Sequence, residues 1–157
     1  MPDVPEYLDS VGRLLGFAAR AVNALTSEKL AQHGLTLPQW IVLTALWRED
    51  GLSVTNIAQY TKSKVPATSR LLGRMEEQGL VTRRSPEGDR RSVQVFLTPK
   101  AKAMSGVLAL YEDINQMILE GFSTSEKKRA VRYLQRMITN TAQHYAASNS
   151  SDPLIAK

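Results

Sequence analysis

Apolar residues recur every three to four positions along most of the chain, which is the period of an amphipathic α-helix. The pattern predicts a helix over residues 6–32 that ends at Gly34, and a second that opens at Pro38 and closes at Gly51. A third, within VTNIAQYT, is short, and Ser53 can cap it. The expected inner positions of the first helix are Leu8, Val11, Leu14, Leu15, Ala18, Ala21, Val22 and Leu25.

A fourth helix is predicted after Ser63, which can cap it, with Pro66 tolerated in the first turn and Gly79 ending it. On a 3.6-residue wheel this helix has two distinct faces. The apolar face carries Val65, Thr68, Leu71, Leu72 and Met75, and the opposite face carries Pro66, Ser69, Arg70, Gly73 and Arg74.

The period then changes from helical to alternating. LVTRRS and SVQVFL flank the turn-forming tetrapeptide PEGD, which predicts a β-hairpin with a basic tip. Within the second strand Val93, Val95 and Leu97 alternate and are expected to point inward.

Helical spacing returns after the hairpin. Thr98-Pro99 opens a predicted fifth helix that continues to Ile118, and Ser123 with Glu126 forms a capping box for a sixth. The sixth helix has apolar positions at Val131, Leu134, Ile138, Thr141 and Tyr145, and residues 148–157 are expected to fray. No sheet is available to cover the apolar stripes of the first and last two helices, so we expect them to pair with a second copy of the chain.

The composition of the chain indicates a soluble globular protein and excludes functions that require cysteine. With 157 residues, 43% hydrophobic and 22% charged, the chain fits one soluble domain or two small lobes. It has no Cys, which excludes disulfides, thiolate metal sites and thiol-based sensing. His33 and His144 have no carboxylate cluster at ligand spacing, so we predict neither a metal nor a cofactor. The first residues lack signal-peptide features and no apolar run reaches about 20 residues, which predicts a cytoplasmic protein without a membrane partner.

The net charge of +5 is concentrated in one segment. Residues 62–102 contain ten Lys and Arg and four acids, or +6, whereas the remainder has ten cations and eleven acids, or −1. Concentrated positive charge on ordered elements is typical of a polyanion binder, because neutralised phosphates release condensed counterions.

The order of elements in this segment indicates double-stranded DNA. A helix, a short turn, a second helix and a basic hairpin form the layout of a winged helix-turn-helix, whose second helix enters the major groove. The predicted fold class is therefore mostly α (an α+β winged helix), with six helices and a two- to three-stranded wing. The predicted DNA contacts are Lys64, Pro66, Ala67, Ser69, Arg70 and Arg74 on the helix, and Arg84, Asp89, Arg90 and Arg91 in the hairpin.

The runs LTLPQWIVLTAL, LSVTNIAQYT and ATSRLLGRMEEQGLVTRRSPEGDRRSVQVFLTPKAK resemble the MarR family of transcriptional regulators. The resemblance covers roughly residues 6–146. Its most specific parts are Asp89-x-Arg91 followed by Leu97-Thr98, and the motif formed by Glu77, Gly79, Leu80 and Val81. Pro66 and Ala67 depart from the hydroxyl residues that family members often carry at those positions.

The resemblance implies a homodimeric repressor or activator on a pseudo-palindromic operator. The DNA-binding lobe would span residues 35–98, and the dimerisation region 6–33 and 99–147. By analogy Arg91 would enter the minor groove, Asp89 would orient it or brace the wing, and a small anionic aromatic or acyl ligand would release the DNA.

Four residues are candidates for binding such a ligand. Arg13, Phe17 and Arg20 form a stripe on the first helix that could hold a carboxylate beside an aromatic ring, or could simply be surface cations or pair across a dimer. Trp40 is the fourth, and its seven-residue spacing from Trp47 suits either a core or a pocket.

Two other classes of function remain to be weighed. The first is a winged-helix protein-interaction module without DNA binding, which binding to duplex DNA at two salt concentrations would distinguish. The second is an enzyme, for which the sequence offers no Cys nucleophile, glycine-rich phosphate loop or paired carboxylates.

Overall fold

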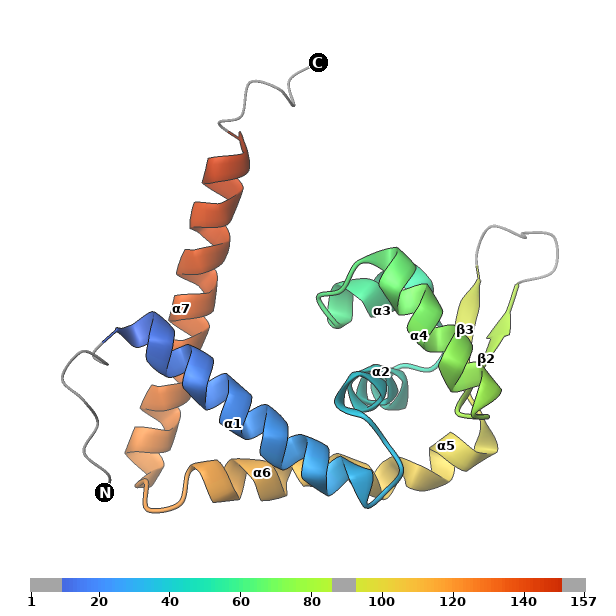
Figure 1. Cartoon of the computed structure of the whole chain (residues 1–157), viewed down its shortest axis with the longest axis horizontal. Coiled ribbons are helices and arrows are strands. Elements are labelled where there is room, and N and C mark those ends of the chain that lie inside the picture. The colour runs from blue at the N-terminus through green and yellow to red at the C-terminus, as the bar shows by residue number, and fades with distance from the viewer. Residues whose placement is uncertain (1–9, 86–92, 151–157) are drawn as a thin grey trace. The chain divides into compact units, whose positions relative to one another are not determined.

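The computed structural model describes residues 10–85 and 93–150 of the chain (Figure 1). The chain divides into two compact units, Met1–Asn115 and Gln116–Lys157. Helices dominate, and the three strands form one small antiparallel sheet, which confirms the predicted mostly-α winged-helix class.

The first unit contains the sheet and nearly all of the shorter helices. In chain order its elements are α1 (Val11–Ala31), α2 (Leu37–Arg48), β1 (Leu52–Ser53), α3 (Val54–Tyr60), α4 (Val65–Glu77), β2 (Val81–Arg84), β3 (Gln94–Leu97), α5 (Pro99–Ala103), the 3₁₀ helix η2 (Met104–Ala109) and α6 (Leu110–Ile118), whose last turn crosses into the second unit.

Helix α2 is the centre of the first unit, and α1, α3, α4 and β3 contact it from different sides (Figure 1). Its start is fixed by Gln39, whose Oε1 accepts hydrogen bonds from the backbone N–H and the hydroxyl of Thr36, at 2.9 and 3.0 Å. Pro38 lies in the first turn, where its missing N–H costs no intrahelical bond. Val42, Leu43 and Leu46 are fully buried because neighbours surround the helix.

Helices α3 and α4 are joined by a tight turn. Ser53 caps α3 as predicted, accepting a hydrogen bond from the backbone N–H of Asn56 at 3.1 Å. The prediction that Ser63 caps α4 is wrong, because the capping residue is Lys64. Ser63 forms hydrogen bonds within the turn instead. Its N–H donates to the Ala58 carbonyl at 2.9 Å, and its hydroxyl donates to the Thr61 carbonyl at 3.4 Å.

The predicted two- to three-stranded wing has three strands among the described residues. The order is β1-β3-β2, all antiparallel, with Val81 opposite Leu97 and Leu52 opposite Val95. Val95 and Leu97 are buried as expected, whereas Val93 is half-buried. Gly79, with φ +67°, makes the left-handed turn that leads from α4 into β2.

The single helix predicted from Thr98-Pro99 to Ile118 is wrong, since the segment is divided into α5, η2 and α6. Thr98 does cap α5, accepting from the N–H of Ala101 at 3.2 Å. The break falls on Ser105 and Gly106, two weak helix formers of the kind that interrupt helices.

The core of the first unit lies between α2, α4 and the sheet. Leu72 and Met75 of α4 are fully buried there, together with Ile57 of α3. Leu30, near the end of α1, and Ile114 of α6 join the same cluster. The remaining core positions are Leu35, Trp40, Val42, Leu43, Leu46, Leu80, Val81, Val95, Leu97, Ala101, Val107 and Leu110.

The second unit consists mainly of α7 (Thr124–Ser150). Its predicted capping box is present: the Ser123 N–H donates to Oε2 of Glu126 at 2.8 Å, and the Glu126 N–H donates to the Ser123 hydroxyl at 3.4 Å. The Ser123 hydroxyl also donates to Oε2 of Glu126, at 2.6 Å. This bond, followed by the one from the Ser123 N–H, lowers the pKa of Glu126 from its ordinary value. The helix reaches Ser150, into the segment 148–157 for which the sequence predicts a frayed tail.

None of the helices within residues 10–85 and 93–150 combines the length and the apolar character that crossing a bilayer requires.

Candidate nucleic-acid interface

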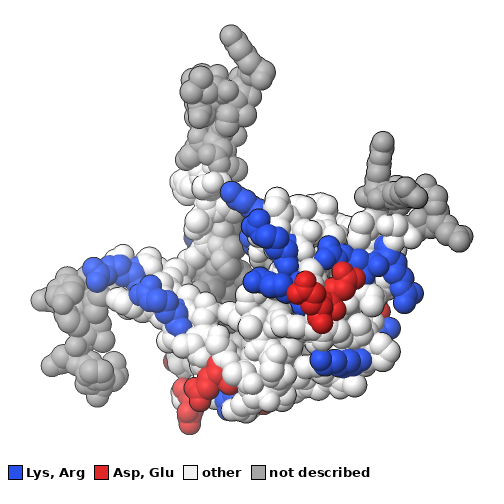
Figure 2. All heavy atoms as spheres, turned by 45° about the vertical axis from the view of Figure 1, so that its right-hand side comes forward, with Lys and Arg blue, Asp and Glu red and all other residues white. Residues whose placement is uncertain are grey.

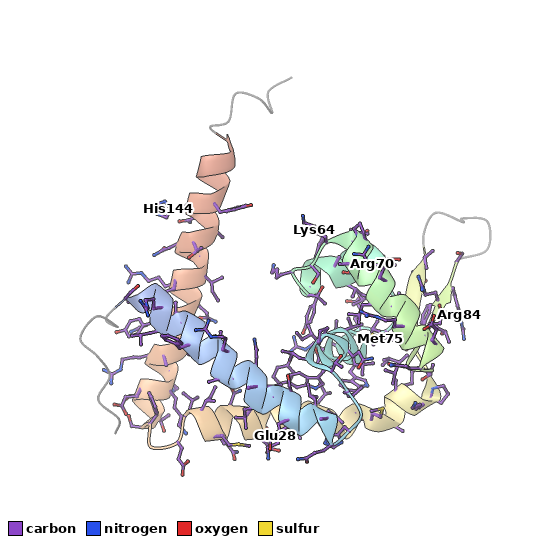
Figure 3. All side chains as sticks on the ribbon, in the orientation of Figure 1. Glu28, Lys64, Arg70, Met75, Arg84 and His144 are labelled. Carbon is purple, nitrogen blue, oxygen red and sulfur yellow. The ribbon has the colours of Figure 1, made fainter. Side chains whose placement is uncertain are left out.

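The outward face of α4 carries the residues that the sequence predicts to contact DNA. Lys64, Pro66, Ala67, Arg70 and Arg74 are exposed. Ser69, the sixth predicted residue, is half-buried. Figure 3 shows Arg70 pointing away from α2, on the side of α4 opposite the buried Met75. Pro66, Arg70 and Arg74 of the predicted polar face are therefore accessible, although Arg74 also lines the cavity described below.

The turn before α4 holds the start of that surface in place. Lys62 has φ +54°, and the N–H groups of Thr61, Lys62 and Ser63 all donate to carbonyls of α3. The hydroxyl of Thr68 donates back to the Lys64 carbonyl at 3.3 Å. A turn with this many backbone bonds orients the first turn of α4, where a helix of this type meets base edges.

The wing is described only at its base. Arg84, at the end of β2, is exposed and its guanidinium lies 5.6 Å from the centre of the Phe96 ring, within cation–π range. Asp89, Arg90 and Arg91 lie outside the described residues, so their predicted roles stay predictions.

Arg83 is not among the predicted DNA contacts. Its side chain turns back from β2 to α4, where its Nε donates to Oε2 of Glu76 at 3.1 Å. Its backbone N–H donates to Oε1 of the same carboxylate at 2.9 Å. The one signal in the sequence was Gly73, an unexpected glycine inside a helix and one turn before Glu76.

Arg70 and Arg74 of α4 take part in no ion pair with the described residues. The ion pairs within residues 10–85 and 93–150 join Arg83 to Glu76 and Lys102 to Asp50, so that neither Arg70 nor Arg74 has a carboxylate partner there. Figure 2 shows Lys and Arg side chains gathered on the face that carries α4 and the strands, with a few acidic side chains among them. This surface suits an anionic partner.

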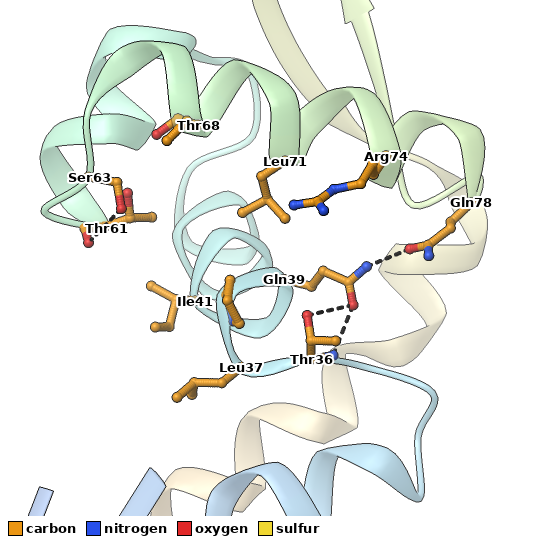
Figure 4. Close-up of a pocket in the computed structure, with 12 residues that line it drawn as sticks. Thr36, Leu37, Gln39, Ile41, Thr61, Ser63, Thr68, Leu71, Arg74 and Gln78 are labelled. Carbon is orange, nitrogen blue, oxygen red and sulfur yellow. Dashed lines mark hydrogen bonds between the residues drawn. The ribbon is translucent and has the colours of Figure 1, made fainter. Parts of the chain in front are cut away.

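A cavity of about 600 Å³ lies on the other side of α4. Three hydrogen-bonded polar residues form one wall, because the Gln39 amide both accepts from Thr36 and donates to Gln78 (Figure 4). The Arg74 side chain reaches into this space from α4. The other lining residues are Leu37, Pro38, Ile41, Thr61, Ser63, Ala67, Thr68 and Leu71.

The four predicted ligand-binding residues lie elsewhere in the first unit. On α1 the guanidinium groups of Arg13 and Arg20 lie 6.0 and 4.7 Å from the centre of the exposed Phe17 ring. Trp40 is a core residue, stacked on Tyr111 with the ring centres 4.1 Å apart. Its buried indole N–H makes no hydrogen bond within the part of the chain that is described. None of the four lines the cavity beneath α4.

Comparison with known proteins places this arrangement among transcriptional regulators. A family model described as the MarR family matches residues 33–92. The regulator MgrA of Staphylococcus aureus is 33% identical over 122 residues, which cover 77% of this chain and 82% of MgrA. TtmR of Methylorubrum extorquens is 38% identical over 105 residues, which cover 66% of this chain but only about half of TtmR, 54%.

The fold is also that of solved structures. One is the complex of Staphylococcus aureus MepR with DNA, which superposes with a TM-score of 0.78 over 83% of this chain and 98% of the MepR chain, at 22% identity. At that level of identity the likeness concerns the fold alone.

Proposed function

Because the chain belongs to the MarR family of DNA-binding transcriptional regulators, we propose that it is a homodimeric repressor that a small lipophilic or aromatic anion releases from a pseudo-palindromic operator. The observation that carries the proposal is the outward face of α4, on which Arg70 and Arg74 lack a carboxylate partner among the described residues.

Helix α4 is proposed to read the major groove. Arg70 lies on its exposed side, one turn after the helix start, and an arginine there can bond a guanine edge with two hydrogen bonds. Lys64 and Arg74 are proposed to contact phosphates, as is Arg84 at the base of the wing. MepR, which has the same fold, was solved as a complex with DNA.

Dimerisation is supported by apolar surface that the single chain leaves uncovered. Val131, Leu134, Ile138 and Tyr145 form one stripe of α7, and Ile138 and Tyr145 are 69% and 72% exposed. Within the first unit, Val11, Leu14, Leu15 and Phe17 of α1 are exposed as well. Apolar side chains in such number on one helix face are typical of an interface. A two-fold dimer would present two copies of α4 to half-sites about one helical turn, 10–10.5 base pairs, apart.

Ligand release is supported by the cavity beneath α4. It combines apolar side chains (Leu37, Ile41 and Leu71) with the cationic Arg74, a suitable lining for an aromatic carboxylate. A carboxylate paired with Arg74 would hold its guanidinium in the cavity, where it already lies, and keep it from turning out to a phosphate. Ligand and DNA would then favour different orientations of the same side chain. The Arg13–Phe17–Arg20 stripe of α1 is the second place proposed for such a ligand.

The test begins with selection of an operator from a random duplex library, followed by binding of operator and random duplex at 50 and 200 mM salt. A dimer that contacts 6–10 phosphates should lose roughly 10³–10⁵ in affinity over that range. Binding that is absent or independent of salt would contradict the proposal and favour a protein-interaction module.

Ligand release is tested separately. Aromatic carboxylates and acyl-CoA compounds are screened by thermal shift, and compounds that raise Tm are then tested for release of the selected operator. A compound that stabilises the protein without releasing DNA is not an effector, because it does not distinguish the two states.

A further inference from the structure

Helix α4 has a glycine in the middle of its exposed side. Gly73 lies between Arg70 and Arg74, and with them it lines a shallow hollow of about 480 Å³ whose other lining residues are Ala67 and Glu77. A glycine inside a helix destabilises it relative to alanine, because the unfolded chain loses more conformational freedom. The helix itself therefore does not explain why position 73 is a glycine, and the explanation must come from a neighbouring element.

That reason is the guanidinium of Arg83. A Cβ atom at position 73 would lie 3.1 Å from Nη2 of Arg83, closer than ordinary van der Waals contact. The arginine tip therefore rests against the backbone of α4 at the one residue that leaves room for it. For comparison, a Cβ at Gly16 of α1 would have its nearest neighbour at 3.7 Å, and one at Gly106 would have none within 4 Å.

Glu76 holds the arginine in this position. Its two oxygens accept from the backbone N–H and from Nε of Arg83, at 2.9 and 3.1 Å, so both the main chain and the side chain of that residue are fixed. The two terminal nitrogens have no hydrogen-bond partner within residues 10–85 and 93–150. The Arg83 side chain is 28% exposed, so its tip can still be reached from solvent.

We propose that Arg83 binds a backbone phosphate of the DNA beside α4, and that Gly73 and Glu76 are the residues that position it. The inference rests on the proposed DNA-binding function and adds a residue to it. The free edge of a guanidinium matches two phosphate oxygens, and holding it in advance lowers the entropy lost on binding.

A phosphate fits this arginine better than a base edge. An arginine that reads a base projects from the helix into the groove, as Arg70 does. Arg83 instead lies against the helix backbone at the edge of the hollow, beside two further arginines of α4. Contacts to phosphates fix the register of a protein on DNA and carry no sequence information themselves.

The decisive variant is Gly73→Ala, measured for both stability and DNA binding. Alanine favours the helix, so Tm should stay the same or rise. The added methyl shifts the Arg83 tip by a few tenths of an ångström, so operator and random duplex should both be bound slightly more weakly and by the same factor. Arg83→Ala, which removes the charge, should lower the slope of log affinity against log salt by about 0.9 for each subunit of the bound dimer. Between 50 and 200 mM this removes about 3.5-fold of the salt effect for each subunit, or about 12-fold for the dimer.

Three further variants distinguish an effect on the position of the Arg83 side chain from an effect on the stability of the fold. In the Arg83→Ala background, adding Gly73→Ala should not change DNA binding further, because both substitutions act on one contact. If Arg83→Ala does not fold, Arg83→Lys keeps the charge without the Nε bond and should show a smaller loss. Gly106→Ala is the matched control and should bind DNA like the wild type.

The inference is overturned if Arg83→Ala keeps the wild-type slope, if Gly73→Ala keeps the wild-type affinity, if the Tm of Gly73→Ala falls together with its affinity, or if Gly73→Ala weakens only the operator. Wild-type binding is measured first. If the wild type shows no salt-dependent DNA binding, the proposed function itself fails; if it does and Gly73→Ala matches it, only the role of Arg83 fails.

Discussion

Helices α4 and α7 have the same kind of sequence and opposite surroundings. Each has an apolar face and a face rich in Lys and Arg, which on α7 comprises Lys128, Arg129, Arg132 and Arg136. The apolar face of α4 packs into the core, where Leu72 and Met75 are 0% exposed. The apolar face of α7 is exposed along its length.

The difference shows what an amphipathic pattern can and cannot specify. It states that one face of a helix must be covered, but it does not state which molecule covers it. Within the first unit, α2, α3 and the sheet cover α4. For α7 we propose a second copy of the chain, so the two helices should respond differently to the same kind of mutation.

The largest effect is expected from Leu72→Ala in α4. This side chain is fully buried, and its truncation leaves a cavity in the only core that α4 has, which should cost about 2–5 kcal/mol of unfolding free energy. Urea denaturation followed by circular dichroism measures it. A loss below about 1 kcal/mol would mean that the α4 face is as loosely covered as that of α7.

Ile138→Glu should leave the fold intact and break the dimer. The side chain is exposed in the single chain, but in the proposed interface each of the two subunits loses the burial of one isoleucine. Each loss is worth about 1.5–3 kcal/mol, or roughly 10–100-fold in the dimerisation constant for each subunit. Sedimentation equilibrium gives the dissociation constant. Gln143→Glu is the matched control, since it adds the same charge about 140° around the helix. Equal effects of the two changes would argue against a directional interface.

Arg70→Ala tests whether the basic faces of the two helices differ in function. On α4 the substitution should cost about 1–3 kcal/mol of operator affinity and relax specificity at one base pair in each half-site. Fluorescence anisotropy on operators with single substitutions measures both quantities. The comparison is Arg136→Ala on α7, which should leave base preference unchanged. Uniform weakening by Arg70→Ala would make this arginine a phosphate contact.

The smallest effect concerns the start of α7. The hydrogen bonds from Ser123 lower the pKa of Glu126, so the ionised form stabilises the folded helix. That contribution is present above the pKa of the unfolded chain and is lost as pH falls through the lower folded value. Helicity measured by circular dichroism should therefore fall slightly in acid, and Glu126→Gln should lack this component. An identical acid profile in the variant would exclude the capping box as its origin.

Local features of the fold could be predicted from the sequence. The capping interactions of Ser53 and of Ser123 with Glu126, and the inward alternation of Val95 and Leu97, depend on neighbours a few residues away. The sequence allowed for a third strand but could not locate it, because two residues, Leu52 and Ser53, form it only by pairing with β3. The 3₁₀ break at Ser105 and Gly106 depends on how strongly tertiary packing opposes two weak helix formers.

The residues of the candidate site likewise fall into those that the sequence could predict and those that it could not. The exposed positions of α4 followed from a wheel because one period sets them all. Arg83 was not among the predicted contacts, because the role that we propose for it depends on a helix and a strand meeting over a glycine. Trp40 was placed among ligand-binding residues, and the sequence could not show that Tyr111 would stack on it in the core.

The two edges of the small sheet bear on how the protein behaves at high concentration. An unpaired strand edge is a template on which other chains can add strands and aggregate. Here the strand at one edge, β1, has only two residues. At the other edge, the backbone N–H of Arg83 in β2 is already bonded to Glu76. The same carboxylate that orients an arginine therefore also protects the wing against edge-to-edge association, and its loss should shorten the time for which the protein stays soluble.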